Sequence, residues 1–310
     1  MSTIHEMQKL QQLAEQNGPL CVGLDTDPSY IPQNILSNYK SAPEAVIAYN
    51  KAIIKRVAEE KSACCFKVQI AYYEAMGLEG LKVFSETLKA VRETGLSVIS
   101  DIKRGDIGAT SDAYAKAHFT GDFETDIITV NPYMGFDTLK PFTSYANPDK
   151  GSKGMFVLLC TSNPGMTDIE KSELKEGGCV FDKVGVELAN ISAEFKAVYP
   201  EQTCSPVGAV VGCTHEDEAR TIREQYKDVF FLIPGYGAQG GAARIAATLL
   251  LHAGGTVNSS RGILCAWKKD PLLASKISSD PLTMDDIADS AARAAVASKE
   301  DLLNAKSLVS

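Results

Sequence analysis

The chain has 310 residues, a length that suits either two average domains or one α/β barrel. Hydrophobic residues make up 45% of it and charged residues 23%, which is typical of a globular protein with a sizeable core. Because its formal net charge is −8, composition gives no electrostatic support for a nucleic-acid partner or an anionic membrane surface. Any cationic contacts to an anionic substrate must therefore be local.

The cysteines and the N-terminal segment indicate the cellular compartment in which the protein works. None of the eight cysteines belongs to a Cys-x-x-Cys pair, and several lie in apolar runs such as Ala63–Phe66. This pattern favours small buried thiols in a reducing compartment over a disulfide framework or a metal site. Residues 1–18 are polar and helix-like without the apolar segment of a signal peptide, and no stretch approaches the roughly 20 apolar residues of a membrane span. We therefore expect a cytoplasmic protein.

Short apolar runs recur along the chain, and each is followed by a helical pattern. Most are nearly continuous in Val, Ile, Leu, Phe or Cys, as in strands that are covered on both faces. In chain order the predicted strands are Leu20–Asp25, Ala63–Gln69, Ser97–Lys103, Asp126–Tyr133, Gly154–Ser162, Pro206–Cys213, Val229–Tyr236 and Gly255–Gly262.

Helical patterns fill the intervals between these strands. The first begins with an N-cap serine, Ser41, and has Glu44 three residues later. A long loop is expected within the wide interval from Asn163 to Ser205, and a closing surface helix is expected in the tail from Thr283 to Ser310. The clearest helix candidates are Ala42–Glu59, Leu78–Thr94, Val180–Val198 and Glu216–Gln225.

Strands that alternate with helices predict a parallel sheet. A count of eight favours closure into a barrel over an open, doubly wound sheet. No Pro/Gly/Ser-rich linker divides the chain. The sequence thus predicts a single (β/α)₈ TIM-barrel domain over residues 1–310, with an N-terminal helix and a C-terminal helical tail.

Charged residues stand where several predicted strands end, and the C-terminal ends of barrel strands build the active site. Asp25, Lys67, Asp101 and Lys103 follow or close three consecutive strands. Any one of these charged residues could simply mark the point where a strand reaches solvent. That alternative weakens when aspartates and lysines recur at the same end of neighbouring strands.

The third strand carries the most informative array. Asp101 and Lys103 are two residues apart, so they share one face of the strand, and Asp106 follows after Arg104-Gly105. The array is Asp-x-Lys-x-x-Asp, with a cation between two anions in the sequence. It could serve catalysis, or it could be a structural network of ion pairs at the barrel mouth.

The loops after strands seven and eight are candidates for binding phosphate. Gly235–Gly241 offers flexible backbone amides and the side chain of Gln239, while Ser259–Gly262 adds the guanidinium of Arg261. Barrels frequently bind phosphate at these two loops, although ordinary turns with a surface arginine are the alternative. The Gly-x-Gly-x-x-Gly pattern lies too late in the chain to open a dinucleotide-binding domain.

The sequence shows no pattern typical of a metal site or of a Ser/His/Asp catalytic triad. The four histidines have no ligand spacing, and no Ser/His/Asp arrangement is evident. A metal site is therefore not expected.

These motifs together resemble the orotidine 5′-phosphate decarboxylases, in the longer branch with Gly-Leu-Asp on strand one. The third-strand motif combined with the Gly-Ala-Gln-Gly-Gly loop is highly specific. The resemblance spans nearly the whole predicted barrel and runs through Val22–Asp25, Phe66–Gln69, Asp101–Thr110, Thr129–Tyr133, Thr161–Gly165, Pro234–Gly241 and Arg261.

The resemblance implies a role for each matching residue. Lys103 is similar to the lysine that protonates the pyrimidine carbon after carbon dioxide leaves, and Asp101 to the carboxylate beside the departing group. Asp25 and Lys67 match groups that hold the ribose hydroxyls and complete an alternating charge network, in which Lys67 and Asp106 count with Lys103 and Asp101 as catalytic residues. Other matches read the pyrimidine edge (Ser162), bind phosphate (Gln239, Arg261) or reach across a homodimer interface (Asp106, Ile107, Thr110).

The same resemblance implies conversion of orotidine 5′-monophosphate to uridine 5′-monophosphate in pyrimidine biosynthesis, without a cofactor. Two alternatives stay open. One is a magnesium-dependent sugar-phosphate decarboxylase or synthase of related fold, whose members generally carry a glutamate where this chain has Lys67. The other is a non-catalytic nucleotide-binding barrel, for which five charged residues at the mouth would have no evident use.

Overall fold

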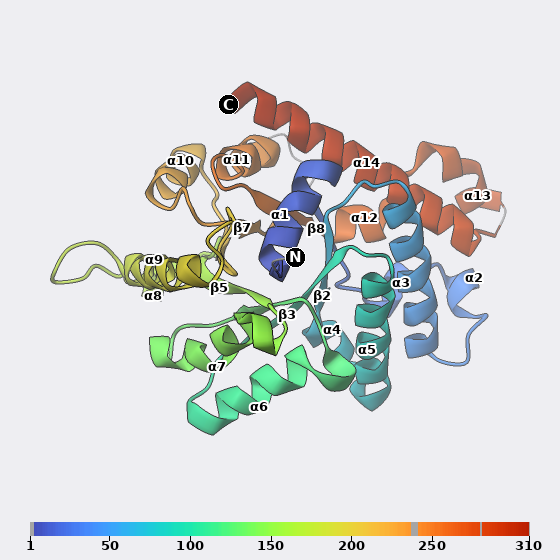
Figure 1. Cartoon of the computed structure of the whole chain (residues 1–310). Coiled ribbons are helices and arrows are strands. Elements are labelled where there is room, and N and C mark those ends of the chain that lie inside the picture. The colour runs from blue at the N-terminus through green and yellow to red at the C-terminus, as the bar shows by residue number, and fades with distance from the viewer. Residues whose placement is uncertain (1–2, 237–240, 280, 310) are drawn as a thin grey trace.

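The computed structural model describes residues 3–236, 241–279 and 281–309. Their strands form a closed parallel barrel in which each strand pairs with the next in sequence order and the eighth pairs with the first (Figure 1). The predicted (β/α)₈ barrel is thereby confirmed. The strands are β1 (Leu20–Gly23), β2 (Cys65–Gln69), β3 (Ser97–Arg104), β4 (Ile127–Val130), β5 (Gly154–Cys160), β6 (Val207–Val211), β7 (Phe231–Ile233) and β8 (Gly255–Ser259).

Helices surround the barrel and match the predicted ones closely. Three of the four helix candidates have the predicted bounds, and the fourth is shifted by one residue at each end. The α-helices are α1 (Glu6–Asn17), α2 (Gln33–Leu36), α3 (Ala42–Glu59), α4 (Ile70–Glu74), α5 (Gly77–Glu93), α6 (Gly108–Phe119), α7 (Lys140–Thr143), α8 (Met166–Ile169), α9 (Val180–Val198), α10 (Glu216–Gln225), α11 (Gly241–Leu249), α12 (Arg261–Leu264), α13 (Ala274–Ser279) and α14 (Met284–Val309).

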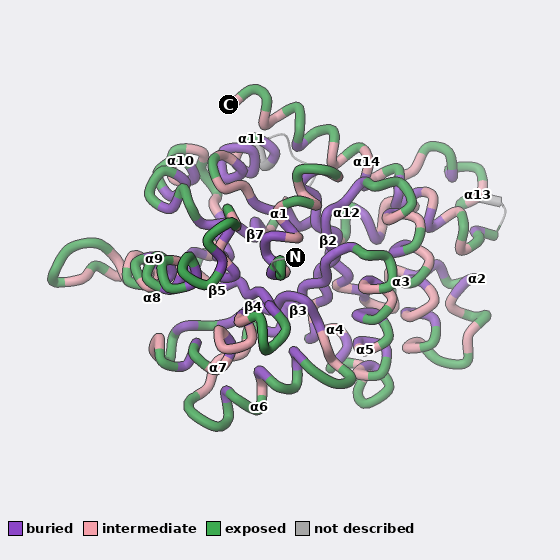
Figure 2. The backbone as a smooth tube through the Cα atoms, in the orientation of Figure 1, coloured by how far each residue is buried: buried purple, intermediate pink, exposed green. Residues whose placement is uncertain are grey.

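Local sequence explains where these helices begin and what they cover. The Ser41 hydroxyl accepts the backbone N–H of Glu44 and caps α3, as the sequence predicts. The tail forms α14, which buries Ile287, Ala291 and Ala295 against its neighbours α3 and α11. Figure 2 shows the result: buried residues follow the barrel, and exposed residues line the outer faces of the helices.

The opening of the barrel at the N-terminal ends of its strands is closed by α1, which lies across it in Figure 1. Met7 and Leu10 of α1 are fully buried against apolar side chains from inside the barrel. Glycine makes this approach possible, because a Cβ at Gly154 would lie 2.6 Å from Met7 Cγ and one at Gly208 would lie 2.9 Å from Met7 Cε. One end of the barrel is thus sealed, which leaves the other end for a site.

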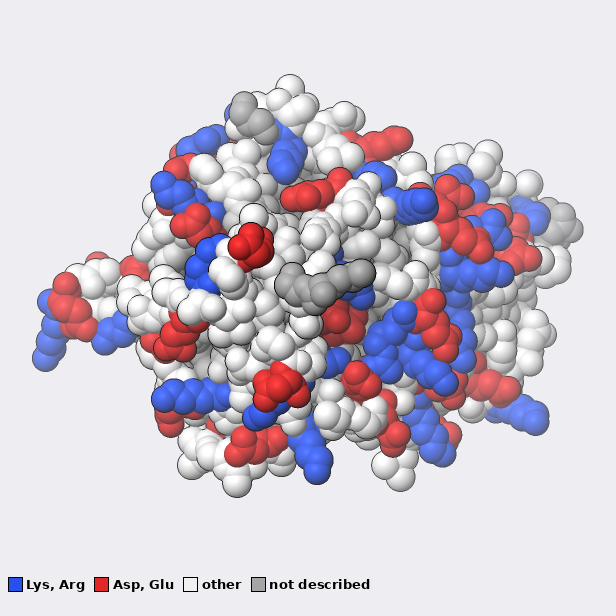
Figure 3. Space-filling model, viewed as in Figure 1, with Lys and Arg blue, Asp and Glu red and all other residues white. Residues whose placement is uncertain are grey.

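Two global features bear on possible partners. No helix within the described part of the chain is long and apolar enough to cross a membrane. On the face drawn in Figure 3, basic and acidic side chains are interspersed over the surface.

Candidate active site

The alternation of β2 and β3 brings charged side chains into the barrel near its C-terminal end. On β2, Cys65 lies in the apolar layer that contacts α1, and Lys67 and Gln69 follow on the same face, nearer the mouth. In the β2–β3 register Gln69 lies opposite Asp101. The barrel interior therefore changes from apolar to charged within two residues along β2.

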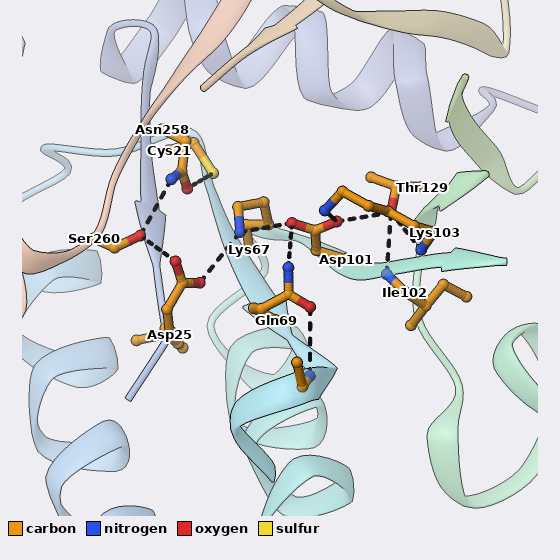
Figure 4. Close-up of polar contacts among 12 residues, drawn as sticks. Cys21, Asp25, Lys67, Gln69, Asp101, Ile102, Lys103, Thr129, Asn258 and Ser260 are labelled. Carbon is orange, nitrogen blue, oxygen red and sulfur yellow. Dashed lines mark hydrogen bonds and ion pairs between the residues drawn. The ribbon is translucent and has the colours of Figure 1, made fainter. Parts of the chain in front are cut away.

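A line of ion pairs crosses the mouth (Figure 4). The Lys67 ammonium contacts Asp101 Oδ2 at 2.9 Å and Asp25 Oδ1 at 3.2 Å. The Lys103 ammonium contacts Asp101 Oδ1 at 2.6 Å. The structure thus brings together Asp25, Lys67, Asp101 and Lys103, and their charges alternate in sign along the line.

The strands that close the barrel extend the line further. Ser260, just after β8, donates its hydroxyl hydrogen to Asp25 Oδ2 at 2.7 Å and accepts a hydrogen bond from the Asn258 amide at 3.2 Å. Gly23 makes room for this contact, since a Cβ there would lie 2.0 Å from Ser260 Oγ. Asp25 is consequently held from both sides, by Lys67 and by Ser260.

Two uncharged side chains also hold Asp101, and sequence reasoning did not assign them. The Gln69 amide donates to Asp101 Oδ2 at 3.0 Å, and the Thr129 hydroxyl donates to Asp101 Oδ1 at 2.8 Å. With the two ammonium groups, four donors surround this one carboxylate. Gln69 ends the second predicted strand, and its contact with Asp101 depends on the β2–β3 register.

Burial and neighbouring charges shift the pKa values of Asp101 and Lys67 in opposite directions. Burial by itself raises the pKa of Asp101, but the ammonium groups of Lys67 and Lys103 outweigh it and lower that pKa to about 2. Burial lowers the pKa of Lys67, but the carboxylates of Asp101 and Asp25 prevail and raise that pKa above its usual value. Both groups are therefore ionised near neutral pH.

The lowered pKa of Asp101 predicts how the free energy of unfolding depends on pH. Because the pKa of Asp101 is lower in the folded chain than its ordinary value of 3.8, ionised Asp101 stabilises the fold above about pH 4. That stabilisation, about 2 kcal/mol, is lost as pH falls toward 2. We expect the difference in free energy of unfolding between the wild type and Asp101→Asn, measured with urea, to shrink by that amount between pH 5 and pH 2. A constant difference would contradict the ion-pair geometry.

Lys103 is the member of the line that faces outward. Its side chain is 45% exposed, whereas those of Lys67 and Asp101 are 7% and 8% exposed. The ammonium is anchored on one side by Asp101 and remains accessible on the other. A bound molecule at the mouth would therefore meet Lys103 first among these groups.

The other predicted residues of the third-strand motif do not join the line within this chain. Among the ion pairs of the described residues, none joins Asp106 to Lys103, and Asp106 Oδ1 instead accepts the N–H of Ile107 at 2.8 Å. Ile107 is 59% exposed, and Thr110 is also exposed. The sequence suggests a cation between two anions. Within the described residues of a single chain, Lys103 is paired with Asp101 but not with Asp106.

Two further predicted residues, Ser162 and Arg261, lie around the same mouth. Ser162 follows β5, and its Cβ lies 3.1 Å from where a Cβ on Gly212 would stand, after β6. Its loop is fixed by Glu170, whose carboxylate accepts the N–H of Thr161 at 2.7 Å. Arg261 begins α12, is exposed, and forms no ion pair within the described ranges. Gln239 lies outside the described residues.

The arrangement favours anion binding and proton chemistry at Lys103. No group of three His, Cys, Asp or Glu side chains in the described part of the chain is placed to hold a metal ion. A closed barrel sealed at one end, with an ordered line of alternating charges at the C-terminal ends of its strands, defines a (β/α)₈-barrel enzyme.

Comparison with known proteins narrows this class. Residues 18–270 match the model of the orotidine 5′-phosphate decarboxylase / HUMPS family. An orotidine 5′-phosphate decarboxylase of Clostridium botulinum (strain Langeland) is 50% identical over 264 residues, which cover 84% of this chain and 89% of that protein. One from Clostridium perfringens (strain SM101) is 48% identical over 261 residues, covering 84% and 88%.

A solved structure agrees with these matches. The OMP decarboxylase of Leishmania donovani superimposes with a TM-score of 0.66 at 26% identity, over 96% of this chain and 99% of that one. The chain belongs to the orotidine 5′-phosphate decarboxylase / HUMPS family.

Proposed function

We propose that this protein decarboxylates orotidine 5′-monophosphate to uridine 5′-monophosphate, with Lys103 stabilising and then protonating C6 of the pyrimidine. The observation that carries the proposal is the exposed Lys103 ammonium, 2.6 Å from Asp101 Oδ1. The names of relatives that are about half identical over most of the chain support the same reaction.

The chemistry explains why a fixed ammonium is needed. When the bond between C6 and the carboxyl carbon breaks, the electron pair stays on C6 in an orbital that no carbonyl can delocalise. Carbon dioxide leaves as this bond breaks, while the Lys103 ammonium stabilises the charge on C6 and then gives C6 a proton. Asp101 holds the ammonium in place before substrate arrives. In this proposal its carboxylate also lies beside the carboxyl group that departs. The amine of Lys103 regains a proton from water after product forms.

The residues around Lys103 would hold the rest of the nucleotide. Asp25 and Lys67 bind the ribose hydroxyls, and Ser162 reads the pyrimidine edge. Arg261 and Gln239 bind the phosphate, which suits a guanidinium that has no ion pair within the described residues. Binding energy from the phosphate then helps to orient the ring at Lys103.

We also propose a homodimer in which each site is completed by its neighbour. Asp106, Ile107 and Thr110 contribute to the partner's site in this proposal. The exposure of Ile107 and Thr110, and the fact that no ion pair among the described residues joins Asp106 to Lys103, support it. The enzyme is expected to act in the cytoplasm as a single-domain protein, which its free cysteines suit.

The first experiment is to add orotidine 5′-monophosphate to purified protein and follow loss of the orotate absorbance. We expect turnover that is unchanged after treatment with EDTA, since the proposed chemistry uses side chains alone. No turnover of the nucleotide, together with turnover of a sugar phosphate that stops with EDTA and returns with magnesium, would favour the metal-dependent sugar-phosphate alternative. Nucleotide binding without any turnover would favour the non-catalytic barrel.

A further inference from the structure

The strand that carries Lys103 departs from regular pairing just at the site. The register between β3 and β4 shifts between Ser100 and Arg104. Within this irregular segment Lys103 has a φ of +45°, in the left-handed region that residues with side chains rarely adopt. Such a backbone persists only where surrounding contacts hold it, and it occurs most often at functional sites.

A single side chain on β4 supplies those contacts. Thr129 is 1% exposed, and its hydroxyl oxygen accepts the backbone N–H of Ile102 and that of Lys103, each at 3.0 Å. The hydroxyl therefore satisfies amides that the irregular segment turns away from the regular ladder. The left-handed backbone of Lys103 is held directly by Thr129.

These two contacts also fix where the Thr129 hydrogen points. A hydroxyl has two acceptor lone pairs and one hydrogen, and here both lone pairs are used by backbone amides, which cannot accept in return. The hydrogen is thus directed to Asp101 Oδ1 at 2.8 Å, the same oxygen that contacts the Lys103 ammonium (Figure 4). Thr129 therefore binds both the backbone of Lys103 and the Asp101 carboxylate that pairs with the Lys103 side chain.

We propose that Thr129 is the positioning residue of this site, which holds the Lys103 backbone and the Asp101 carboxylate in one fixed relation without touching substrate. The proposal rests on the function proposed above, in which Lys103 must be aimed at C6. Misplacement of a reacting group by about 1 Å can cost about 10²-fold in rate. The effect of losing the hydroxyl should therefore fall on the chemical step.

The test compares Thr129→Val, which keeps the shape but removes the hydroxyl, with Thr129→Ser, which keeps the hydroxyl. We expect Thr129→Val to lower kcat for orotidine 5′-monophosphate by about 10²-fold, while KM and the Kd of uridine 5′-monophosphate change less than about threefold. Thr129→Ser should stay within about fivefold of the wild-type kcat, since it retains the three hydrogen bonds.

Thr125→Val is the matched control. Thr125 is also fully buried, just before β4 at the opposite end of the barrel, and its hydroxyl donates to the Val98 carbonyl at 3.1 Å. It should cost stability without a comparable loss of kcat.

Other outcomes would overturn the inference. A folded Thr129→Val enzyme with kcat within about threefold of wild type would do so, as would a Thr129→Ser enzyme as slow as Thr129→Val. If Thr129→Val does not fold, Thr129→Ala replaces it with the same expectation. Failure of both to fold while Thr125→Val folds would assign Thr129 to barrel stability alone. Failure of the wild type to decarboxylate would instead contradict the proposed function.

Discussion

Lys103→Ala should lower kcat for orotidine 5′-monophosphate by at least about 10⁴-fold, because one ammonium provides both charge stabilisation and the proton. Binding of uridine 5′-monophosphate should persist, since the proposed ribose and phosphate contacts come from other residues. The Lys103 side chain is 45% exposed, so its removal leaves no large buried cavity. Steady-state kinetics together with calorimetric titration of the product would measure both effects.

Lys82→Ala is a suitable control for this variant. Lys82 is a surface residue of α5 that is 71% exposed, and among the described residues its one ion pair is with nearby Glu79, so its truncation should leave kcat unchanged. Decarboxylation by Lys103→Ala at a rate near wild type would eliminate the proposed mechanism. Equal loss of turnover and product binding would indicate that Lys103 anchors the nucleotide.

Mixing inactive Asp25→Ala protein with inactive Asp106→Ala protein should restore activity. If Asp106 acts across the interface and Asp25 acts within its own chain, each mixed dimer has one site in which both residues are intact. Random exchange of subunits then regenerates about one quarter of all sites. The specific activity of the mixture, followed after subunit exchange has been demonstrated with labelled chains, measures this fraction.

The matched control mixes Asp25→Ala with Lys103→Ala. Both residues belong to the same ion-pair line of one chain, so every site of a mixed dimer lacks one of them. This mixture should stay inactive. No recovery in the Asp25 and Asp106 mixture, once exchange is established, would contradict the assignment of Asp106 to the partner's site.

The fold was predictable because the barrel strands are covered on both faces and so form continuous apolar runs. The ends of the strands were harder to predict. Several strands stop before the predicted end, as β1 does at Gly23, because Asp25 and similar residues leave the ladder to enter the mouth. Arg261 likewise begins a short helix after β8.

The charged part of the site was predictable for a similar physical reason. Alternation along a strand places Asp101 and Lys103 on one face, and the structure brings their side chains together. Thr129 and Ser260 were not predictable, because threonine and serine are ordinary residues at strand positions. Their contacts depend on inter-strand register and on the shift in β3, neither of which a single sequence specifies.

The hydrogen bond from Ser260 to Asp25 spans the junction at which the last strand meets the first. The two residues are 235 positions apart in the chain, so this link forms only when the final βα unit has docked. A folding intermediate that lacks β8 would leave Asp25 without its serine and the proposed phosphate arginine away from the mouth. Catalytic competence in this protein therefore requires that the first and last strands have paired, and regain of turnover during renaturation reports completion of the ring.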